Sequence, residues 1–394
     1  MPTQTSTALS ALTETRQAIE AAWDAARSRL PSNPLWCIVF AGPDRDLSLI
    51  QSVLVEKAPG AVILGCHTAG EFTEQGLAHN AVALMLVSSD ELLVAGKTAT
   101  GARADPLVLA KALASNWAAL SAKAAARGLG ASTSVMLVDG LAGSGDRVVK
   151  EYQGATRVFQ QIVGGAAGDE GRFSSTGVLG PDGATSDGAA VAQIFGRRPW
   201  GAGAAHGLAP ASKRMTVTKA KGSSLIEIDG RPAFEAYQAH AATKGVTLTE
   251  ANRGAFLIGN EIGVYFLDNL HHARAPVGVE TDGSLKLVAD ITEGASICIL
   301  DGEPDSMVAA CREAAMQAKT SLKGHPAAGV LVFDCVCRGM ILGAKGFERE
   351  IEAVRHVFPG VPVLGFLTYG EIARFGGRLD GWHNTTSVVA AIPG

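Results

Sequence analysis

A short motif, Thr-x-Gly-Glu, occurs twice in the sequence, and its side chains are of types that hold ligands. The two copies read Thr68-Ala69-Gly70-Glu71 and Thr368-Tyr369-Gly370-Glu371. Each copy follows an apolar run that is typical of a buried strand. A hydroxyl and a carboxylate at the carboxyl end of a strand lie where open α/β sheets usually bind ligands. The glycine lets the backbone turn sharply or approach a ligand closely.

The segments around the motif also match, which indicates an internal duplication. Identical residues stand at an offset of 300 in the pairs Pro59/Pro359, Gly60/Gly360, Leu64/Leu364 and Gly65/Gly365. A His-Asn pair then recurs before an apolar run, as His79-Asn80 and as His383-Asn384, after a loop that is four residues longer in the second copy. Since pseudo-symmetric halves often bind ligands between them, we expect Glu71 and His79 to lie opposite Glu371 and His383.

A purely structural interpretation of the motif stays open beside the functional one. In that interpretation the threonine and asparagine side chains bond the turn backbone, and each glutamate pairs with a lysine or arginine. Duplicated folds keep their duplicated turns, so two copies do not decide between the interpretations.

The run Phe333–Gly339, "FDCVCRG", supplies a thiol and a guanidinium close to the second motif. Arg338 could bind a carboxylate or phosphate with its planar donors, or it could form an ion pair within the protein. Cys335 could be a nucleophile, or a small buried hydrophobic residue as free cysteines often are. With His383 as base and Glu371 as orienting acid, Cys335 would make a thiol-dependent enzyme.

The middle of the chain repeats the same order of parts and predicts a third, degenerate copy. A strand ending at Asp139, a glycine-rich loop, a helix and the short strand "IVGGAAGDEG" with Gly165 follow one another. The loop precedes a helix and could bind an anion. It lacks the Gly-Lys-Ser/Thr of a nucleotide-binding loop, and Asp139 and Asp146 would repel phosphate.

Alternating strands and helices predict an α/β fold of layered mixed sheets, two-lobed, with internally duplicated strand-turn-strand units. Apolar spacing predicts a helix from Thr7 to Leu30, another over Asp105–Gly128 and a strand over Gly329–Gly339. We divide the chain into an N-terminal helix (1–33) and two larger domains (34–225 and 226–394).

Composition restricts the classes of function. The chain has 394 residues, 47% of them hydrophobic and 18% charged, with a net charge of −4, so nothing points to nucleic acid or an acidic membrane surface. We expect no signal peptide, no membrane insertion, a cytoplasmic location and six cysteines in the thiol form.

The histidines show no metal-site spacing. No HExxH motif or Cys/His cluster is present, although any one of the 9 histidines could be an axial haem ligand. His206, His240 and the pair His271-His272 lie in the linker and the second half of the chain.

Taken together, "GCHTAGE", "VDGLAG", "VGGAAGD", "EIDGRPAFEAY", "FDCVCRG" and "VPVLGFLTYGEI" resemble the FIST family, with an N-terminal and a C-terminal FIST domain. The resemblance covers nearly the whole chain from about Pro34. It implies a ligand-sensing signal-transduction protein, with amino acids as proposed ligands. It also implies haem-based nitric oxide sensing in some bacterial members, which act on partner histidine kinases.

The sequence thus predicts a sensory protein that binds a small molecule in a cleft between pseudo-symmetric lobes and relays the signal to a separate partner protein. The expected ligand-binding residues are Thr68, Glu71, His79, Asn80, Asp139, Gly165, Cys335, Arg338, Thr368, Tyr369, Glu371, His383 and Asn384. For an amino acid, Glu71 or Glu371 would hold the ammonium and Arg338 the carboxylate. The alternatives are the thiol-dependent enzyme and a ligand-free scaffold for protein contacts.

Overall fold

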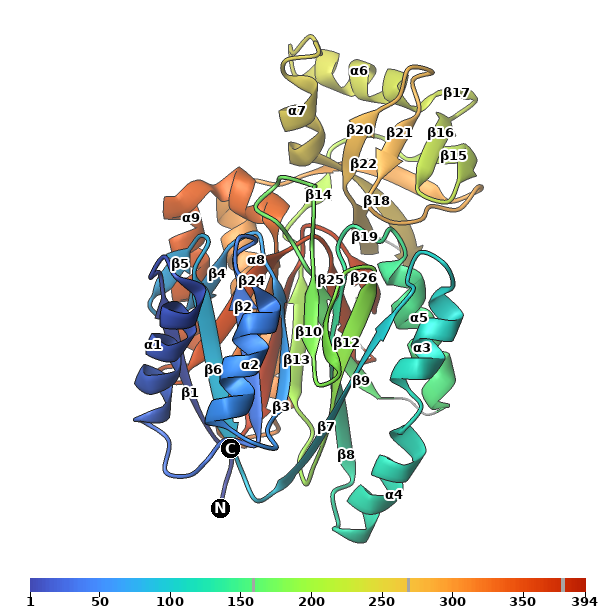
Figure 1. Ribbon diagram of the computed structural model, residues 1–394. Coiled ribbons are helices and arrows are strands. Elements are labelled where there is room, and N and C mark those ends of the chain that lie inside the picture. Colours follow the sequence, from blue (N-terminus) through green and yellow to red (C-terminus); the bar gives the residue numbers. More distant parts are fainter. Residues whose placement is uncertain (158–159, 268–269, 377–379) are drawn as a thin grey trace.

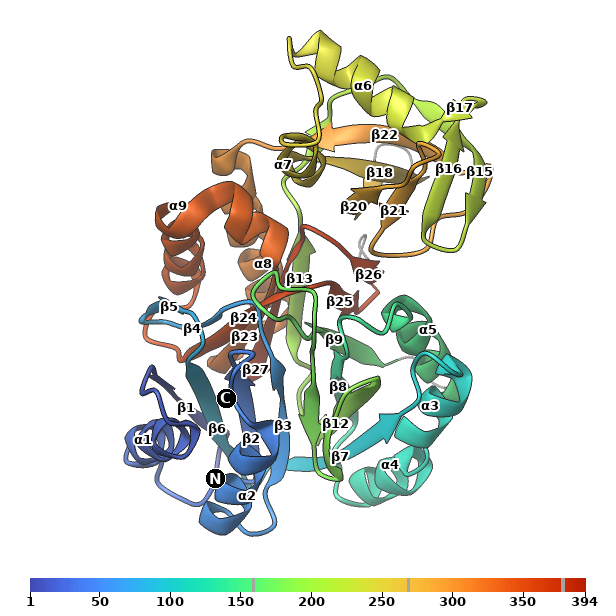
Figure 2. The same ribbon diagram turned by 45° about the horizontal axis from the view of Figure 1, so that its top comes forward.

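Three six-stranded sheets form the body of the molecule, and a smaller lobe sits on one end of it (Figures 1 and 2). The computed structural model describes residues 1–157, 160–267, 270–376 and 380–394. Both chain ends lie on the side of the body away from the lobe. None of the helices in these described ranges combines the length and apolar character needed to cross a membrane.

Each body sheet is built around one of three sequence units with the same order of parts. The first unit comprises β1 (Gln4–Ser10), α1 (Thr15–Arg27), β2 (Trp36–Ala41), α2 (Leu47–Lys57), β3 (Val62–His67), β4 (Glu71–Thr73), β5 (Gly76–Ala78) and β6 (Val82–Ser88). The second comprises β7 (Leu92–Thr100), α3 (Pro106–Leu113), α4 (Trp117–Ala126), β8 (Ala131–Val138), α5 (Gly145–Thr156), β9 (Gln161–Ala166), β10 (Val178–Gly180), β11 (Gly183–Thr185) and β12 (Gly188–Gly196). The third comprises β13 (Gly201–Ala205), α8 (Pro304–Ser321), β23 (Ala327–Cys335), α9 (Val336–Val357), β24 (Val363–Thr368), β25 (Glu371–Arg374), β26 (Gly381–His383) and β27 (Ser387–Pro393).

The units exchange one hairpin each in a cyclic order. The sheet orders are β1-β6-β2-β3-β10-β11, β7-β12-β8-β9-β25-β26 and β13-β27-β23-β24-β4-β5. The first unit therefore completes the third sheet, the third completes the second, and the second completes the first. This arrangement confirms the duplication and the degenerate third copy, and gives the body a pseudo-three-fold axis.

The smaller lobe is an insertion in the third unit, between β13 and α8. Its elements are β14 (Ala209–Pro210), β15 (Met215–Lys221), β16 (Ser224–Ile228), β17 (Arg231–Pro232), α6 (Ala233–Thr243), α7 (Arg253–Gly259), β18 (Asn260–Leu267), β19 (Leu270–Arg274), β20 (Pro276–Val279), β21 (Leu285–Leu287) and β22 (Ser296–Asp301). The α/β class with mixed sheets is confirmed, and the second lobe arises from this insertion rather than from two halves of the chain. The domain boundary at 225/226 stays a prediction.

The body has its deepest core where the inner faces of the three sheets meet. Phe40 of β2 contacts Phe366 of β24, with ring centroids 4.4 Å apart, and Phe333 of β23 at 6.4 Å. β2 and β6 are buried along their whole length, which explains why their sequences are continuous apolar runs. The outer faces are covered by helices; α1 and α2, for example, pack on the first sheet (Figure 1).

Three expected elements differ in the structure. The helix expected over Thr7–Leu30 begins only at Thr15, because Gln4–Ser10 pairs with β6 as an edge strand. The helix expected over Asp105–Gly128 is two helices, the first of which is capped by the Asp105 side chain. The strand that ends the run Gly329–Gly339 stops at Cys335, so Arg338 lies on helix α9 instead of a strand end.

Close approach of the exchanged hairpin to its host sheet depends on glycine at one position. A Cβ atom on Gly365 would lie 2.3 Å from the Phe72 ring of the hairpin and 2.7 Å from the Val332 carbonyl oxygen. We expect Gly365→Ala to destabilise the protein by about 1–3 kcal/mol in denaturant unfolding, because the added methyl overpacks this contact. Gly130→Ala, where a Cβ meets nothing within 4 Å, is the control. Equal stability of the two variants would contradict this packing argument.

Candidate functional site

The turns that follow β3, β9 and β24 meet at the pseudo-three-fold axis and bond one another. Their backbone bonds run from Ala69 N to the Leu367 oxygen at 3.0 Å, from Gly168 N to the His67 oxygen at 3.0 Å, and from Tyr369 N to the Ala166 oxygen at 3.1 Å. The two Thr-x-Gly-Glu copies therefore do lie against each other, as the duplication predicts. They meet through backbone groups, with their polar side chains turned into the protein.

Thr68 and Glu71 form a closed local bond set in the first turn. The Glu71 carboxyl group accepts hydrogen bonds from the Thr68 hydroxyl and from the backbone N–H of Ala81, the residue before β6. Thr68 and Glu71 are fully buried. Burial raises the pKa of Glu71 to about 8, against the opposing effect of the bonds from Thr68 and Ala81.

The second copy repeats this geometry. Thr368 donates to Glu371, and the backbone N–H of Thr386 donates to the same carboxyl group at 3.0 Å. Burial raises the pKa of Glu371 well above its ordinary value, and the nearby Cys335 acts in the same direction. In both units the glutamate thus holds the start of the returning strand through a threonine hydroxyl and a backbone N–H, and not through the lysine or arginine of the structural interpretation. A ligand contact of these four side chains stays a prediction.

The two His-Asn pairs are not structurally equivalent. Glu71 and Ala81 are 10 residues apart, whereas Glu371 and Thr386 are 15 apart, so the second loop is five residues longer and not four. The left-handed residue before each bonded amide is Asn80 (φ 47°) in the first unit and Thr385 (φ 52°) in the third. His79 therefore corresponds to Asn384, and the sequence match at the pairs is off by one.

His383 consequently has a position of its own. It pairs with Glu371 across the β25-β26 hairpin, whereas Ala78 pairs with Glu71 in the first unit. His79 lies at the surface and its Nδ1 is 3.8 Å from Glu170, while His383 is 1% exposed. The expected facing arrangement of His79 and His383 is not found.

Asp139 and Gly165 have structural contacts in the second unit. Asp139 accepts hydrogen bonds from Leu141 N at 2.9 Å, Asp187 N at 2.5 Å and the Thr176 hydroxyl, and so holds the start of β12. Gly165 pairs with Glu371, and a Cβ there would lie 2.7 Å from Thr368 Cγ2. Their predicted ligand contacts stay predictions.

Tyr369 organises the long loop of the second unit. Its hydroxyl donates to Asp169 and accepts from Gly171 N at 2.8 Å, and its ring stacks on Phe173 with centroids 4.9 Å apart. Asp169 in turn accepts from the backbone N–H groups of three loop residues, Phe173, Ser174 and Ser175.

Arg338 is fully buried and bonded to protein groups. It pairs with Asp334 at 2.8 Å and with Glu350, and it donates to the carbonyl oxygens of His206 at 2.8 Å and Met307 at 2.7 Å. In the described part of the chain, Cys311, Asp334 and Glu350 form the one group with metal-ligand spacing, and the Arg338 guanidinium lies among them. The alternative of an internal ion pair is therefore what the geometry favours.

Cys335 is held as an unreactive thiol. Burial raises its pKa well above the ordinary value, and Cys337 and Glu261 act in the same direction. The Glu371 carboxyl group is already bonded to Thr368 and Thr386. This environment is the opposite of the electropositive surroundings that activate a nucleophilic cysteine.

A polar cluster, which we call the junction site, lies where the inserted lobe meets the body. It consists of His206, Glu261, His272, Arg274, His383 and Asn384. The rings of His272, on the lobe, and His383, on the body, stack in parallel with centroids 5.1 Å apart. Arg274 donates to the Trp382 carbonyl oxygen at 3.2 Å, and Asn384 Oδ1 accepts from Ala275 N at 3.3 Å.

Several buried polar atoms of the junction site have no well-aligned hydrogen-bond partner among the described residues. They are Nδ1 of His272, Nε of Arg274, Nδ2 of Asn384, Oε2 of Glu261 and the ring nitrogens of His383, of which one lies near enough to the Ala373 backbone to form a weak hydrogen bond. Buried polar groups are normally bonded, because leaving one unbonded costs about 1–3 kcal/mol. The site therefore offers unbonded nitrogen atoms and one unbonded carboxyl oxygen, and a polar ligand could supply the missing hydrogen-bond partners.

The electrostatics of the junction site follow from its burial. Burial lowers the pKa of His206 and of His272 to about 4, and it lowers that of His383 well below the ordinary value. Neighbouring Arg274 lowers the pKa values of His272 and His383 further. At neutral pH the histidines are uncharged, and Arg274 is the positive group of the site.

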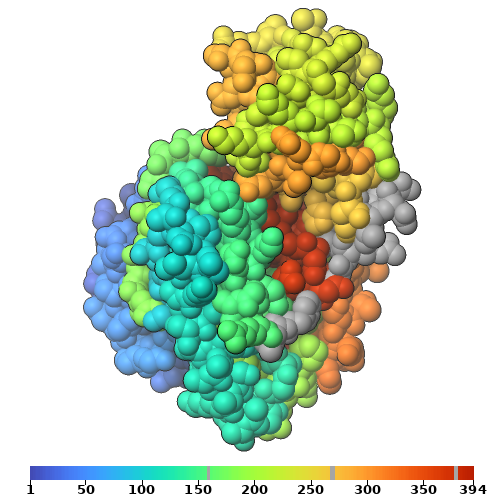
Figure 3. Space-filling model, turned by 90° about the vertical axis from the view of Figure 1, so that its right-hand side faces the viewer, coloured from blue at the N-terminus to red at the C-terminus, as the bar shows by residue number. Residues whose placement is uncertain are grey.

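A recess separates the lobe from the body on one face of the molecule. Figure 3 shows the C-terminal part of the chain, in red, at the floor of this recess below the lobe. Across it, Arg147 of α5 pairs with Asp290 of the lobe at 3.2 Å. The glycine-rich loop from Asp139 to Asp146 leads into α5, and Asp146 lies close enough to Arg274 to affect its pKa.

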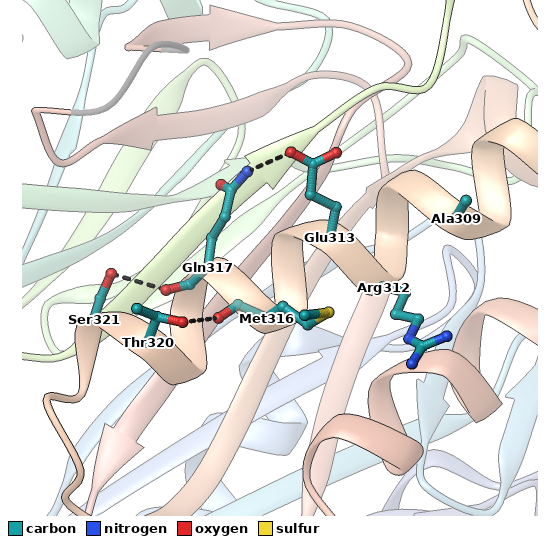
Figure 4. Close-up of a pocket in the computed structure, with 7 residues that line it drawn as sticks. All are labelled: Ala309, Arg312, Glu313, Met316, Gln317, Thr320 and Ser321. Atoms are coloured by element: carbon teal, nitrogen blue, oxygen red, sulfur yellow. Dashed lines mark hydrogen bonds between the residues drawn. The ribbon is translucent and has the colours of Figure 1, made fainter.

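Two surface pockets lie away from the junction site. A groove of about 630 Å³ runs along α8, where Gln317 donates to Glu313 and Ser321 donates to the Gln317 carbonyl oxygen (Figure 4). A pocket of about 780 Å³ in the lobe contains His240, whose Nε2 is already bonded to Asn260 at 3.0 Å.

Sequence reasoning found His383 and Asn384 but missed Glu261 and Arg274 of the same site. It noted His206 and the pair His271-His272 only as candidate haem ligands. The available signal was the charged and histidine-rich stretch His271–Arg274 inside an otherwise apolar strand pair.

The buried carboxyl of Glu71 gives a test with a defined pH dependence. We expect Glu71→Ala to lower the free energy of unfolding by about 2–4 kcal/mol, because the Thr68 hydroxyl and the Ala81 N–H lose their acceptor. The folded pKa of about 8 exceeds the unfolded value of about 4.3, so this group's stabilisation is present at low pH and lost as the pH rises to 8.

Glu71→Gln should therefore match the wild type near pH 4 and become more stable than it as the pH rises, by roughly 3–5 kcal/mol at pH 8 and above, measured by denaturant unfolding. Glu20→Gln, in an exposed pair with Arg16, is the control, with no such trend. A Gln variant that loses stability in parallel with the wild type above pH 6 would show that Glu71 is ionised in the folded protein.

Comparisons with known proteins identify two family domains in the sequence. The FIST N domain model matches residues 36–231, and the FIST C domain model matches residues 233–374. A search of curated proteins finds no match. Among solved structures, a cyanuric acid hydrolase from A. caulinodans matches with 11% identity and a TM-score of 0.30, over 50% of this chain and 72% of that one. A likeness this weak indicates neither an activity nor a ligand. The two domain models cover most of the chain, which therefore belongs to the FIST family of signal-transduction sensory proteins.

Proposed function

We propose that this protein senses a free amino acid at the junction site. The observation that carries the proposal is the set of unbonded polar atoms under the inserted lobe, which offers both a positive group and a free carboxyl oxygen. Arg274, with the His383 ring and the Asn384 amide beside it, suits a carboxylate. Glu261 Oε2 suits an ammonium group. Arg274 and Glu261 thus replace the pair expected from sequence, Arg338 with Glu71 or Glu371. The side chains of that expected pair are already bonded to other groups inside the protein.

Glu261 adds a property that an ammonium ligand would change. Burial raises its pKa to about 8, against the opposing effects of Thr385, Arg274 and Arg338. The carboxyl group is therefore mostly protonated at neutral pH without a ligand. A bound ammonium favours the ionised form, so binding at pH 7 would release a proton to the buffer.

The junction site also suggests how binding is relayed. His383 and Asn384 belong to the body, whereas Glu261, His272 and Arg274 belong to the lobe. A ligand that contacts both parts binds more tightly to one arrangement of lobe and body than to another. Binding therefore shifts the population towards the arrangement that is bound more tightly. We propose that a separate signalling protein, such as a histidine kinase, recognises that arrangement in the cytoplasm.

The test is calorimetric titration of the purified protein at pH 7 with each of the common L-amino acids. We expect at least one to bind, and Arg274→Ala to weaken binding by about 1.5–3 kcal/mol, the range for a charge-assisted hydrogen bond. His383→Ala should also weaken it. His325→Ala is the matched control, since this exposed histidine lies outside the junction site, and it should bind as the wild type does.

Proton release supplies an independent readout. The heat of binding should depend on the ionisation enthalpy of the buffer in the wild type, and this dependence should disappear in Glu261→Gln. If no amino acid binds, or if Arg274→Ala retains full affinity, the amino-acid proposal is wrong.

Haem-based nitric oxide sensing is the alternative proposal. The free nitrogens of His272 and His383 are the atoms of the junction site able to ligate iron. Their rings stack at 5.1 Å with Arg274 beside them, so a porphyrin would have to part the rings and cover the charged groups with an apolar plane. The residues of the site therefore fit a small zwitterion better than a porphyrin.

A UV–visible spectrum of protein purified from cells supplied with a haem precursor separates the two proposals. For an amino-acid sensor we expect only the aromatic band. A Soret band that shifts on adding nitric oxide to the reduced protein, and that is lost in His383→Ala, would instead favour haem.

A further inference from the structure

A further cavity lies beside the pseudo-three-fold axis, on the side of α9. We call it the axial pocket; its volume is about 340 Å³. All three units contribute to it, with Leu77 and His79 from the first, Glu170 from the second, and Val336, Phe347 and Leu367 from the third. By contrast, the groove along α8 is lined by that helix alone, and the pocket in the lobe is lined by lobe residues alone.

We propose that the axial pocket binds a small, mainly apolar molecule with a planar or branched body and at most one polar group. The volume lies at the low end of the ~300–1,000 Å³ range of small-molecule sites, which excludes a peptide or a large cofactor. Most of its wall is apolar, including Leu77, Val336, Phe347 and Leu367. A ligand of roughly the size of indole satisfies both conditions.

Polar recognition in the axial pocket is limited to one corner. Glu170 accepts from Asn80 N at 2.7 Å and pairs with Arg172 at 3.4 Å, so its charge is already compensated. His79 is 3.8 Å from the same carboxylate, and its ring is largely exposed. This corner suits a single neutral donor such as a ring N–H, and it offers no free charge for an ionic ligand.

The wall of the axial pocket is connected to the junction site through one turn of α9. Val336 and Gly339 line the pocket, while Arg338, between them in sequence, donates to the carbonyl oxygens of His206 at 2.8 Å and Thr385 at 3.3 Å. His206 belongs to the junction site, and Thr385 follows Asn384. A ligand that displaces this turn therefore displaces the backbone that carries two junction residues.

A break in α9 separates that turn from the rest of the helix, and the ion pair between Arg338 and Glu350 spans the break. Gly343, which also lines the axial pocket, has φ 63° and ψ 175°, values outside any helix, and separates Val336–Leu342 from the rest of α9. Met340 on this short segment is half exposed. We infer that the axial pocket is an effector site for the junction site; this coupling rests on the proposed function, whereas the pocket itself does not.

The test uses 5-fluoroindole as the probe and follows its ¹⁹F NMR signal during titration with the full-length protein. We expect saturable binding to the wild type and at least tenfold weaker binding to Leu77→Trp, whose indole would fill the pocket. Leu77→Ala keeps the pocket open and should still bind. Met316→Trp, in the exposed groove of α8, is the matched control and should bind as the wild type does.

Two results would overturn the site: no saturable binding to the wild type, or equal binding to the wild type and Leu77→Trp when that variant has a native circular dichroism spectrum.

Coupling between the axial pocket and the junction site is tested by titrating the protein with the amino acid that it binds, with and without saturating 5-fluoroindole. A change of at least threefold in its affinity is expected, and the reciprocal change must appear in the probe's affinity. Unchanged affinity overturns the coupling alone. If no amino acid binds, the proposed function fails while the ¹⁹F titration still decides the site.

Discussion

The body depends on three backbone hydrogen bonds that join the turns after β3, β9 and β24 around one axis. Each bond joins a different pair of units, so each turn needs its neighbour in place. Backbones that approach this closely leave little room for side chains, and a Cβ on Gly168 would lie 2.8 Å from Ala69 N. Polar side chains near the axis are consequently turned inward, where Glu71 and Glu371 satisfy the first amides of the returning strands.

The inserted lobe breaks this symmetry and creates the candidate site. In the first unit the hairpin position equivalent to His383 is Ala78, and the surface beside it holds no second lobe. In the third unit the insertion covers β26 and brings Arg274 and His272 against it. A repeated scaffold thus supplies rigid strands, and a single non-repeated segment supplies the unbonded groups that a ligand can use.

The duplication could be predicted from sequence because it depends on local requirements. Gly65 and Gly365 stand in apolar runs where backbones touch, and no other residue fits there, so residue type and spacing reveal the unit. The junction site could not be found in the same way. Glu261 and Arg274 meet His383 across more than a hundred residues, and nothing local to them shows which segment covers them. The two His-Asn pairs are identical in sequence but occupy different structural positions. The residues that correspond in structure are Asn80 and Thr385, which both have left-handed backbone conformations.

The cyclic hairpin exchange also determines when the chain can become native during synthesis. The second sheet needs β25 and β26, and the third needs β27, which ends at Pro393. β4 and β5, made early, have no host strand until β24 has left the ribosome. Nascent chains therefore carry unpaired strand edges for most of the synthesis of these residues, and the body closes only once β24 to β27 have emerged. On this topology, either family domain expressed alone would leave exchanged strands without their partners.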